Sequence, residues 1–489
     1  MGKIAHNKCI GTLQKAIFCS SFESIFEQII VFVTGIIMAR MLTPKSYGIC
    51  GILMIFVTIS QGLVDAGLGA ALIYHREESQ TEYHDSITVF WINVLFSILC
   101  YFLLFASSGM IANFNRTPEM RSLLRVLAFL VIINALGLVQ RNLFRKRLEL
   151  FPIAIANIIG YLIGGIIGIV CAYHGLEAWS LVYYRLSKTT VEVIILYSCS
   201  SWRPKLEFYT DRIKTLFNYG LKFAIQGIIE SLFNNIDSLI IGHCFNMSSV
   251  GYYARAQSLV AMPRVFLQGI TGRVFFPFFA SLQNDIETAK KKFVDFIMVL
   301  CSLLLLAMGA LWVIAPHIIR LLLTDKWIST VPLVRVLCLF AWTYPIITTT
   351  NALLNGIGAV SSVIKLTIVQ KATMLLISLC CSFFSLEVFA AGIGVGVLLN
   401  AIFGLYAVKL HVSLRLFRIV VSLTIKILVI ACFYAGVYFM FKSLIVPPII
   451  QIILVLGVTL IIGIVFLLRH YHEFTTKKGM PHILSLTKK

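Results

Sequence analysis

Charged residues are scarce in this chain. They make up 13% of its 489 residues, whereas 59% of the residues are hydrophobic and the mean hydropathy is +0.92. A soluble core cannot enclose that much apolar surface, so the composition excludes a soluble enzyme or a soluble binding module. The sequence therefore predicts an all-α polytopic membrane protein.

Catalytic and metal-binding motifs are absent as well. The sequence contains no GxSxG, HExxH, Walker A or DxD motif, and its twelve cysteines show no CxxC pairing or metal-ligand spacing. A membrane polymerase or glycosyltransferase usually carries its acidic residues on a substantial external loop, and no external connection here is long enough. We therefore expect no enzyme activity and no bound cofactor.

Fourteen apolar runs are long enough to cross a bilayer as helices of about 20 residues. They lie near residues 14–42, 47–74, 86–112, 121–142, 152–174, 178–198, 216–243, 250–280, 292–316, 331–356, 361–385, 388–408, 418–441 and 447–468. No small-residue cleavage site follows the first run, so we expect a retained helix rather than a signal peptide. Glycines at 160–168 in the fifth run predict close approach by a neighbouring helix.

Basic residues set the expected orientation. With the N-terminus inside, the outer connections hold only Lys45, Arg116, Arg320, Lys326 and Lys442, and the remaining basic residues of the connections lie inside. Positive residues stay on the cytoplasmic side, so we expect both termini in the cytoplasm. The net charge of +20 then faces anionic membrane lipid. We expect no nucleic-acid partner, because the basic residues are scattered through short loops without interleaved aromatics.

The chain also contains an internal repeat. A shift of 203 positions keeps two hydrophobic segments, a short turn and a following polar stretch in register without a gap. The identical pairs include Thr12 with Thr215, Leu13 with Leu216, Glu27 with Glu230, Gly48 with Gly251, Gly69 with Gly272 and Gln80 with Gln283.

The repeat predicts the domain organisation. We expect a six-helix N-lobe at 1–199, a basic cytoplasmic linker at 200–215, a six-helix C-lobe at 216–410, two further helices at 411–470 and a cytoplasmic tail at 471–489. Six is an even number, so both repeats start on the same side of the membrane. A pseudo-two-fold axis along the membrane normal would then relate the two lobes.

Acidic residues inside the apolar runs are the first candidates for a site. A charge near the middle of a bilayer costs about 3 kcal/mol on insertion scales, so it needs a role. Glu27 on helix one, and Glu230 and Asp237 on helix seven, lie on polar faces that match under the repeat. We expect them to line an aqueous cavity and to bind substrate or a coupling cation. Alternatively, they pair with basic residues and hold helices together.

The second and eighth helices repeat this pattern. Gln61 and Asp65 share one face, as do their equivalents Arg264 and Gln268. Arg264 lies near the centre of its run, where the fork of donors on a guanidinium suits a phosphate or pyrophosphate. The alternative for Arg264 is an ion pair with Asp65 or Glu27.

Three further cations complete the candidate set. Arg255 and Arg273 would share one helical face about 27 Å apart, with Arg264 on the opposite face if the helix is unbroken. We expect Arg255 and Arg273 near the two membrane surfaces, either beside the substrate path or as anchors to the headgroups. Lys365 enters helix eleven from the inside, where it either meets an incoming phosphate or marks the cytoplasmic end.

Several stretches carry a family resemblance. They are ARMLTPKSYG at 39–48, DAGLGAALI at 65–73, TVFWINVLF at 88–96, GYYARAQSLVAMP at 251–263, GRVFFPFFASLQND at 272–285, VPLVRVLCLF at 331–340 and NALLNGIG at 351–358. In these stretches the chain resembles the polysaccharide-transporter branch of the multidrug/oligosaccharidyl-lipid/polysaccharide (MOP) exporters, the Wzx-like flippases. Arg255 and Arg273 match arginine positions of this branch, whereas Arg264 does not. Glu177 stands where the branch commonly has glycine.

The resemblance implies a function. Such flippases are fourteen-helix, V-shaped bundles that move undecaprenyl-pyrophosphate-linked oligosaccharide across the bacterial inner membrane by alternating access, for surface polysaccharide synthesis. A polysaccharide polymerase machinery is the implied partner, and Na⁺ or H⁺ is the expected coupling ion. One alternative is a cation-coupled exporter of small drugs, from a sister branch that generally has twelve helices. A membrane enzyme that ligates or polymerises glycans is the other.

Overall fold

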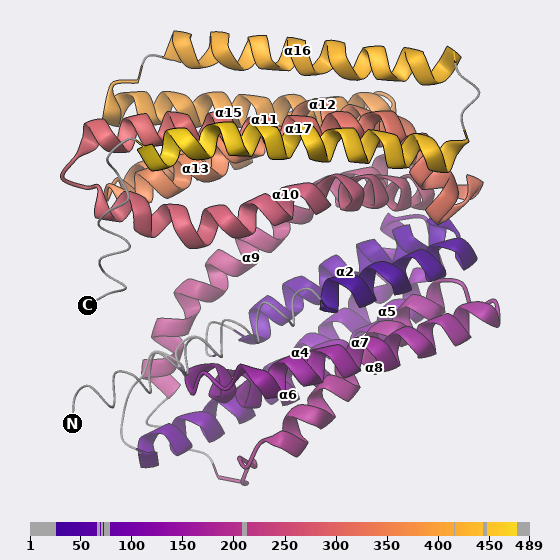
Figure 1. Cartoon of the computed structure of the whole chain (residues 1–489). Helices are drawn as coiled ribbons and strands as arrows, with labels where there is room; N and C mark the ends of the chain where they lie inside the picture. Colours follow the sequence, from indigo (N-terminus) through magenta and orange to yellow (C-terminus); the bar gives the residue numbers. More distant parts are fainter. Residues whose placement is uncertain are drawn as a thin grey trace. The chain divides into compact units, whose positions relative to one another are not determined.

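The structure is a computed structural model that describes residues 26–65, 69, 72, 79–207, 213–414, 416–443 and 447–476. All regular elements within these ranges are helices (Figure 1). Ten helical segments of this described part are long and apolar enough to cross a membrane. The predicted all-α polytopic membrane class is confirmed.

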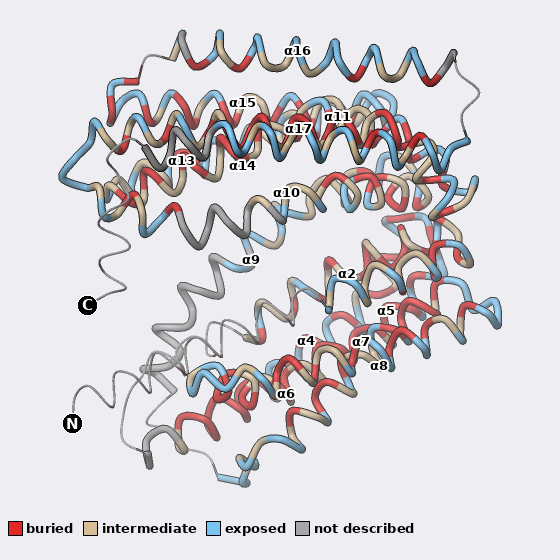
Figure 2. The backbone as a smooth tube through the Cα atoms, viewed as in Figure 1, coloured by how far each residue is buried: buried red, intermediate tan, exposed pale blue. Residues whose placement is uncertain are grey.

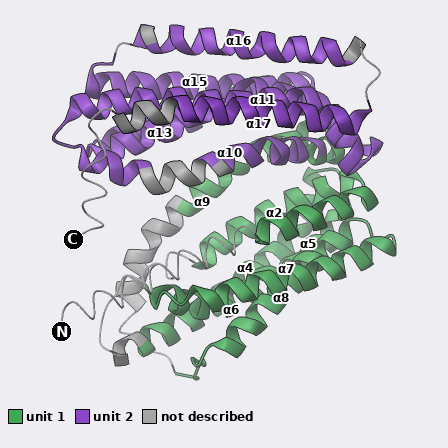
Figure 3. Ribbon diagram, viewed as in Figure 1, with its two compact units in different colours: residues 1–251 green, residues 252–489 purple. Residues whose placement is uncertain are grey.

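Contacts divide the chain into two compact units, residues 1–251 and 252–489 (Figure 3). The division falls inside α10 (Met247–Ser281), so α9 (Ile213–Cys244) belongs to the first unit. The lobes predicted at 1–199 and 216–410 are defined by the repeat rather than by contacts, and they stay a prediction.

The first unit is a bundle of long helices joined by short turns. Residues 26–41 are helical, and they precede α2 (Pro44–Asp65), α4 (Ser79–Phe114), α5 (Met120–Leu127), α6 (Phe129–Lys146), α7 (Leu150–Tyr173), α8 (Ala178–Cys199) and α9. Helix α2 is central, because it packs on α4, α6, α8 and α9. Its side chains Ile52, Leu53 and Val57 are fully buried in consequence.

Glycines bring α7 and α8 into close contact along their length. A Cβ added at Gly160 would lie 2.9 Å from the Lys188 carbonyl oxygen, and one at Gly164 would lie 2.8 Å from the Lys188 Cβ. Small residues spaced four apart let two helix backbones approach in this way in a membrane protein. The predicted close approach at 160–168 is confirmed.

The second unit is built around α11 (Ile286–Leu323). After α10 and α11 come the short 3₁₀ helix η2 (Asp325–Trp327), α12 (Thr330–Ala341), α13 (Tyr344–Gly356), α14 (Val360–Cys381), α15 (Leu386–Val412), α16 (Leu416–Ser443) and α17 (Pro448–Thr476). Helix α11 contacts α12, α13, α15, α16 and α17. The side chain of Asp285 caps its start by accepting the Thr288 N–H at 3.0 Å.

The helices follow the predicted apolar runs, with two kinds of difference. The fourth run is divided at Ala128 into α5 and α6, and the tenth is divided at 342–343 into α12 and α13. Several helices also extend beyond their runs, as α11 does beyond the predicted 292–316. Hydropathy marks only the part of a helix that suits the bilayer interior, and polar turns continue the helix beyond it.

Exposed residues recur along the helices of both bundles (Figure 2), and many of them are large and apolar. Phe102 and Leu103 in the first unit are 62% and 59% exposed, and Leu376 and Leu460 in the second are 63% and 65% exposed. Such exposure along whole helices is expected where lipid, rather than water, surrounds the protein.

A close contact at Gly309 attaches α16 to α11. An added Cβ there would overlap the ring of Tyr434, whose hydroxyl donates to the Leu306 carbonyl oxygen at 2.9 Å. We predict that Gly309→Ala displaces this ring and lowers the free energy of unfolding by about 1–3 kcal/mol, as overpacking usually does. Thermal unfolding of the detergent-solubilised protein measures the effect.

Gly436→Ala on α16 is the matched control, because an added Cβ at Gly436 has no heavy atom within 4 Å. Equal unfolding temperatures for the two alanine variants would contradict the prediction.

Candidate functional site

Glu192 of α8 is a buried acidic residue of the first unit, with 4% of its surface exposed. Its carboxylate accepts hydrogen bonds from Arg141 of α6 and from Lys188 of α8, each at 2.5 Å. The Lys188 ammonium also lies 4.6 Å from the ring centre of Tyr161 on α7. One carboxylate therefore holds two cations, and these connect α8 to α6 and α7.

Glu27 enters the same region from the helix at 26–41. The hydroxyl of Tyr161 donates a hydrogen bond to its carboxylate, and Arg185 lies near enough to act on both Tyr161 and Tyr184. This partner favours the interpretation in which Glu27 holds helices together.

Asp65 lies at the end of α2. It accepts the backbone N–H of Gly69 at 3.2 Å, and the charges of Arg145 and Arg141 act on it. The charge of Arg141 thus acts on two carboxylates, those of Glu192, with which it forms an ion pair, and Asp65. Gln61, one turn earlier on α2, is half-buried.

Sequence reasoning missed three members of this network. Arg141 stands next to the end of the predicted fourth run, 121–142, and is expected among the basic residues on the inner side, but α6 continues to Lys146. Lys188 and Glu192 are four residues apart inside an apolar run, and this spacing places both on one helix face. That pattern is the one that could have identified them.

In the second unit, Arg264 meets an aromatic ring. Its guanidinium lies over Tyr344 of α13, 4.2 Å from the ring centre, and its buried Nε has no hydrogen-bond partner among the described residues. An aromatic ring attracts a guanidinium that lies over its face, so the ring contacts the flat side of the planar cation. The in-plane Nε–H donor then remains available to an incoming acceptor.

Arg255 contacts a different element. Its guanidinium lies 5.5 Å from the ring centre of Trp327 in η2. Helix α10 runs unbroken through Pro263, so Arg255 and Arg264 are about two and a half turns apart. The separate partners agree with the predicted opposite faces.

The other predicted residues lie on α9, α10 and α14. Glu230 on α9 and Lys365 on α14 are exposed, and Asp237 on α9 is half-buried. The side chains of Gln268 and Arg273 lie outside the part of the chain that the structure describes. Within that part, no three His, Cys, Asp or Glu side chains come together as a metal ion would require.

An apolar cavity of about 250 Å³ lies between α11, α12 and α16 of the second unit. Its lining includes Trp312, Leu339, Trp342 and Tyr434. Arg335 lies one turn before Leu339 on α12, and its guanidinium is 4.7 Å from the ring centre of Trp312. A cation beside an apolar cavity suits an amphipathic ligand.

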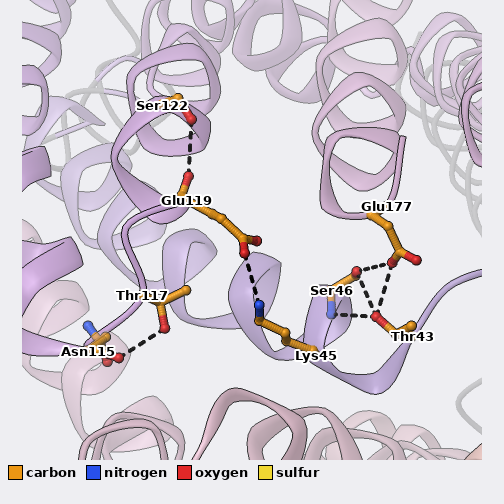
Figure 4. A network of polar contacts seen from close by, with 8 residues as sticks. All are labelled: Thr43, Lys45, Ser46, Asn115, Thr117, Glu119, Ser122 and Glu177. Atoms are coloured by element: carbon orange, nitrogen blue, oxygen red, sulfur yellow. Dashed lines mark hydrogen bonds and ion pairs between the residues drawn. The ribbon is translucent and has the colours of Figure 1, made fainter. Parts of the chain in front are cut away.

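The start of α2 is linked to the connection before α8 (Figure 4). The hydroxyls of Ser46 and Thr43 donate to the Glu177 carboxylate at 2.5 and 3.0 Å. Glu177 has φ 44° and ψ −123°, a conformation that glycine adopts far more readily than other residues. In the same picture, Lys45 forms an ion pair of 2.9 Å with Glu119.

Comparison with known proteins identifies the family. Residues 37–332, more than half of the chain, match the family model described as polysaccharide biosynthesis protein. The chain belongs to this family. It is 24% identical over 330 residues to the lipopolysaccharide biosynthesis protein WzxC of Escherichia coli (strain K12). It is 25% identical over 328 residues to the succinoglycan biosynthesis transport protein ExoT of Rhizobium meliloti (strain 1021).

These alignments cover 66% and 67% of this chain, and they cover 66% of each relative, which is just under two thirds of its length. The resemblance of the sequence to the polysaccharide-transporter branch of the MOP exporters is confirmed at the level of the family.

Solved structures show the fold of this family member. The lipid II flippase MurJ, in an inward closed conformation, superimposes with a TM-score of 0.74 at 12% identity, covering 93% of this chain and 99% of MurJ. An inward-facing multidrug resistance MATE family transporter of the MOP superfamily gives a TM-score of 0.62 at 16% identity, covering 81% of this chain and 98% of its own. The chain therefore has the MurJ and MATE fold.

Proposed function

We propose that this protein is a flippase that translocates undecaprenyl-pyrophosphate-linked oligosaccharide units across the bacterial inner membrane by alternating access. It supplies surface polysaccharide synthesis and performs no enzymatic step. Both termini lie in the cytoplasm, Na⁺ or H⁺ drives the cycle, and a polysaccharide polymerase machinery receives the product. The two repeats form the two lobes, as the sequence predicts.

The family match carries this proposal. WzxC is named for lipopolysaccharide biosynthesis, and ExoT is named as a transport protein of succinoglycan biosynthesis. The apolar surface of both bundles supports a task within the membrane rather than in solution.

The chemistry of the second unit supports an anionic, lipid-linked cargo. The free Nε–H of Arg264 is a donor for a pyrophosphate oxygen, and hydrogen bonds to charged groups are the strong ones. The apolar cavity between α11, α12 and α16 offers a surface for part of a polyprenyl chain. A sugar-only or cation-only cargo would need neither feature.

Deletion of the gene in its host tests the proposal. We expect surface glycan to disappear and the complete lipid-linked oligosaccharide to accumulate on the cytoplasmic leaflet. In right-side-out spheroplasts, an added glycosidase should therefore fail to digest that lipid-linked unit until the wild-type gene is restored.

Two other outcomes would overturn the proposal. Digestible, unpolymerised units on the outer leaflet would assign the protein to ligation or polymerisation. Normal surface glycan together with lowered drug tolerance would assign it to drug export, which the MATE likeness keeps as the second candidate.

A further inference from the structure

The turn between α9 and α10, here called the α9–α10 tip (242–251), belongs to the first unit and packs against other helices of that unit at two places. The ring of His243 stacks on Phe114 at the end of α4, with ring centres 4.1 Å apart and planes inclined by 16°. Met247 and Val250 are 4% and 1% exposed, so these two side chains of the tip are buried against its neighbours. The second place is the start of α2.

Two glycines form the contact at the start of α2. A Cβ added at Gly48 would overlap the carbonyl oxygen of Met247, and a Cβ added at Gly251 would overlap the carbonyl oxygen of Pro44. The added Cβ at Gly48 would also lie 3.2 Å from the Gly251 nitrogen. The two backbones therefore touch directly, in a geometry that Cα–H···O=C contacts favour.

The contact is reciprocal under the internal repeat. The shift that places Gly48 on Gly251 also places Pro44 on Met247, since both pairs differ by 203. Gly48 meets the carbonyl of Met247, which lies four residues before Gly251, and Gly251 meets the carbonyl of Pro44, which lies four residues before Gly48. Such an exchange of partners is the property of a two-fold contact.

We propose that this reciprocal glycine contact is the reversible closure of the substrate path at the end that the basic residues predict to be outside. The inference rests on the proposed transport function. The first, second, seventh and eighth predicted helices carry the matched polar faces expected to line the path. The second of these helices is α2 and the eighth is α10, and the glycine contact joins them. Their separation at this end would open the path.

The chemistry of the contact suits repeated opening. At Gly48 and Gly251 the nearest atoms across the contact are backbone atoms, so parting the two helices at these positions requires no rotamer change of either glycine. The attraction between the two backbones depends on their close approach, because dispersion energy falls off steeply when a gap of even about half an ångström opens. A single methyl group should therefore weaken closure selectively.

Thiol labelling of a Val250→Cys variant tests the closure. Val250 is 1% exposed within the contact, whereas the natural Cys244 of the same tip is exposed and reports that the reagent reaches this end. A membrane-impermeant maleimide is added to intact spheroplasts, and mass spectrometry reads both positions. We expect the introduced thiol to react at least ~10-fold more slowly than Cys244, because its rate follows the open fraction.

Glycine variants in this background give the decisive comparison. Gly48→Ala and Gly251→Ala should each accelerate labelling at position 250 by roughly five-fold or more while leaving Cys244 unchanged. Gly51→Ala is the matched control on α2, since the nearest atom to its added Cβ is 4.0 Å away.

Two results would overturn the proposal. One is labelling at position 250 as fast as at Cys244 without any glycine substitution, a comparison that needs no destabilised variant. The other is equal labelling in the Gly48, Gly251 and Gly51 variants. The assay uses no glycan, so its failure leaves the proposed transport untouched, and a failed export assay leaves the labelling result standing.

Discussion

Arg264→Ala should reduce surface glycan export by about ten-fold to a hundred-fold at equal protein level. A hydrogen bond to a charged group contributes about 1.5–3 kcal/mol, and each 1.4 kcal/mol is about a factor of ten. The guanidinium lies over Tyr344 with a donor to spare, so its loss removes recognition of the pyrophosphate without removing an ion pair from the described core. Export is measured as surface glycan per cell, normalised to membrane-inserted protein.

Two further variants sharpen this experiment. Arg264→Lys keeps the charge but loses the planar fork, so export should recover only in part. Arg320→Ala removes an exposed arginine, whose side chain is 61% exposed beside Asp325, and export should stay normal. Normal export in Arg264→Ala would remove this residue from the substrate path.

Glu192→Ala should lower the free energy of unfolding by about 3–5 kcal/mol, the usual result of breaking a buried ion pair from one side. The substitution leaves Arg141 and Lys188, whose side chains are only 21% and 16% exposed, without the carboxylate between them. Glu192→Gln should lose less, because the amide oxygen still accepts a hydrogen bond. Thermal unfolding in detergent and the steady-state amount in membranes measure the effect.

The matched control is Glu287→Ala, which breaks an ion pair of 3.4 Å with Lys290 in which the glutamate is 73% exposed. Exposed pairs contribute roughly 0–1 kcal/mol, so unfolding should hardly change. Replacing Glu192, Arg141 and Lys188 together by apolar residues should restore much of the stability lost in Glu192→Ala. Equal stability of the Glu192 and Glu287 alanine variants would refute a structural role for the network.

The positions of the spans could be predicted because hydropathy responds to the same bilayer that selects the helices. Helix interruptions could not. Ala128 carries neither the backbone restriction of proline nor the freedom of glycine, yet it separates α5 from α6 while fully buried. Such a break is set by tertiary packing, which a single sequence does not display.

The candidate site shows the same limit. Arg264 was recognisable from its depth in an apolar run, but its partner Tyr344 lies about 80 residues away along the chain, and nothing in local periodicity connects them. Glu27 was recognised as an acid inside an apolar run, whereas its hydrogen bond to Tyr161 depends on how α7 packs. Sequence patterns therefore find costly residues, and packing decides what satisfies them.

Glu177 also has a consequence for how this protein can diverge. At the start of α15, Ser385 caps its own helix by accepting the Val388 N–H at 3.3 Å, whereas Glu177 before α8 serves another helix, α2. Glutamate is tolerated in a glycine-like backbone because the Thr43 and Ser46 hydroxyls stabilise its carboxylate. Substitutions at positions 43, 46 and 177 therefore depend on one another. In descendants that lose the two hydroxyls, selection should favour glycine at position 177.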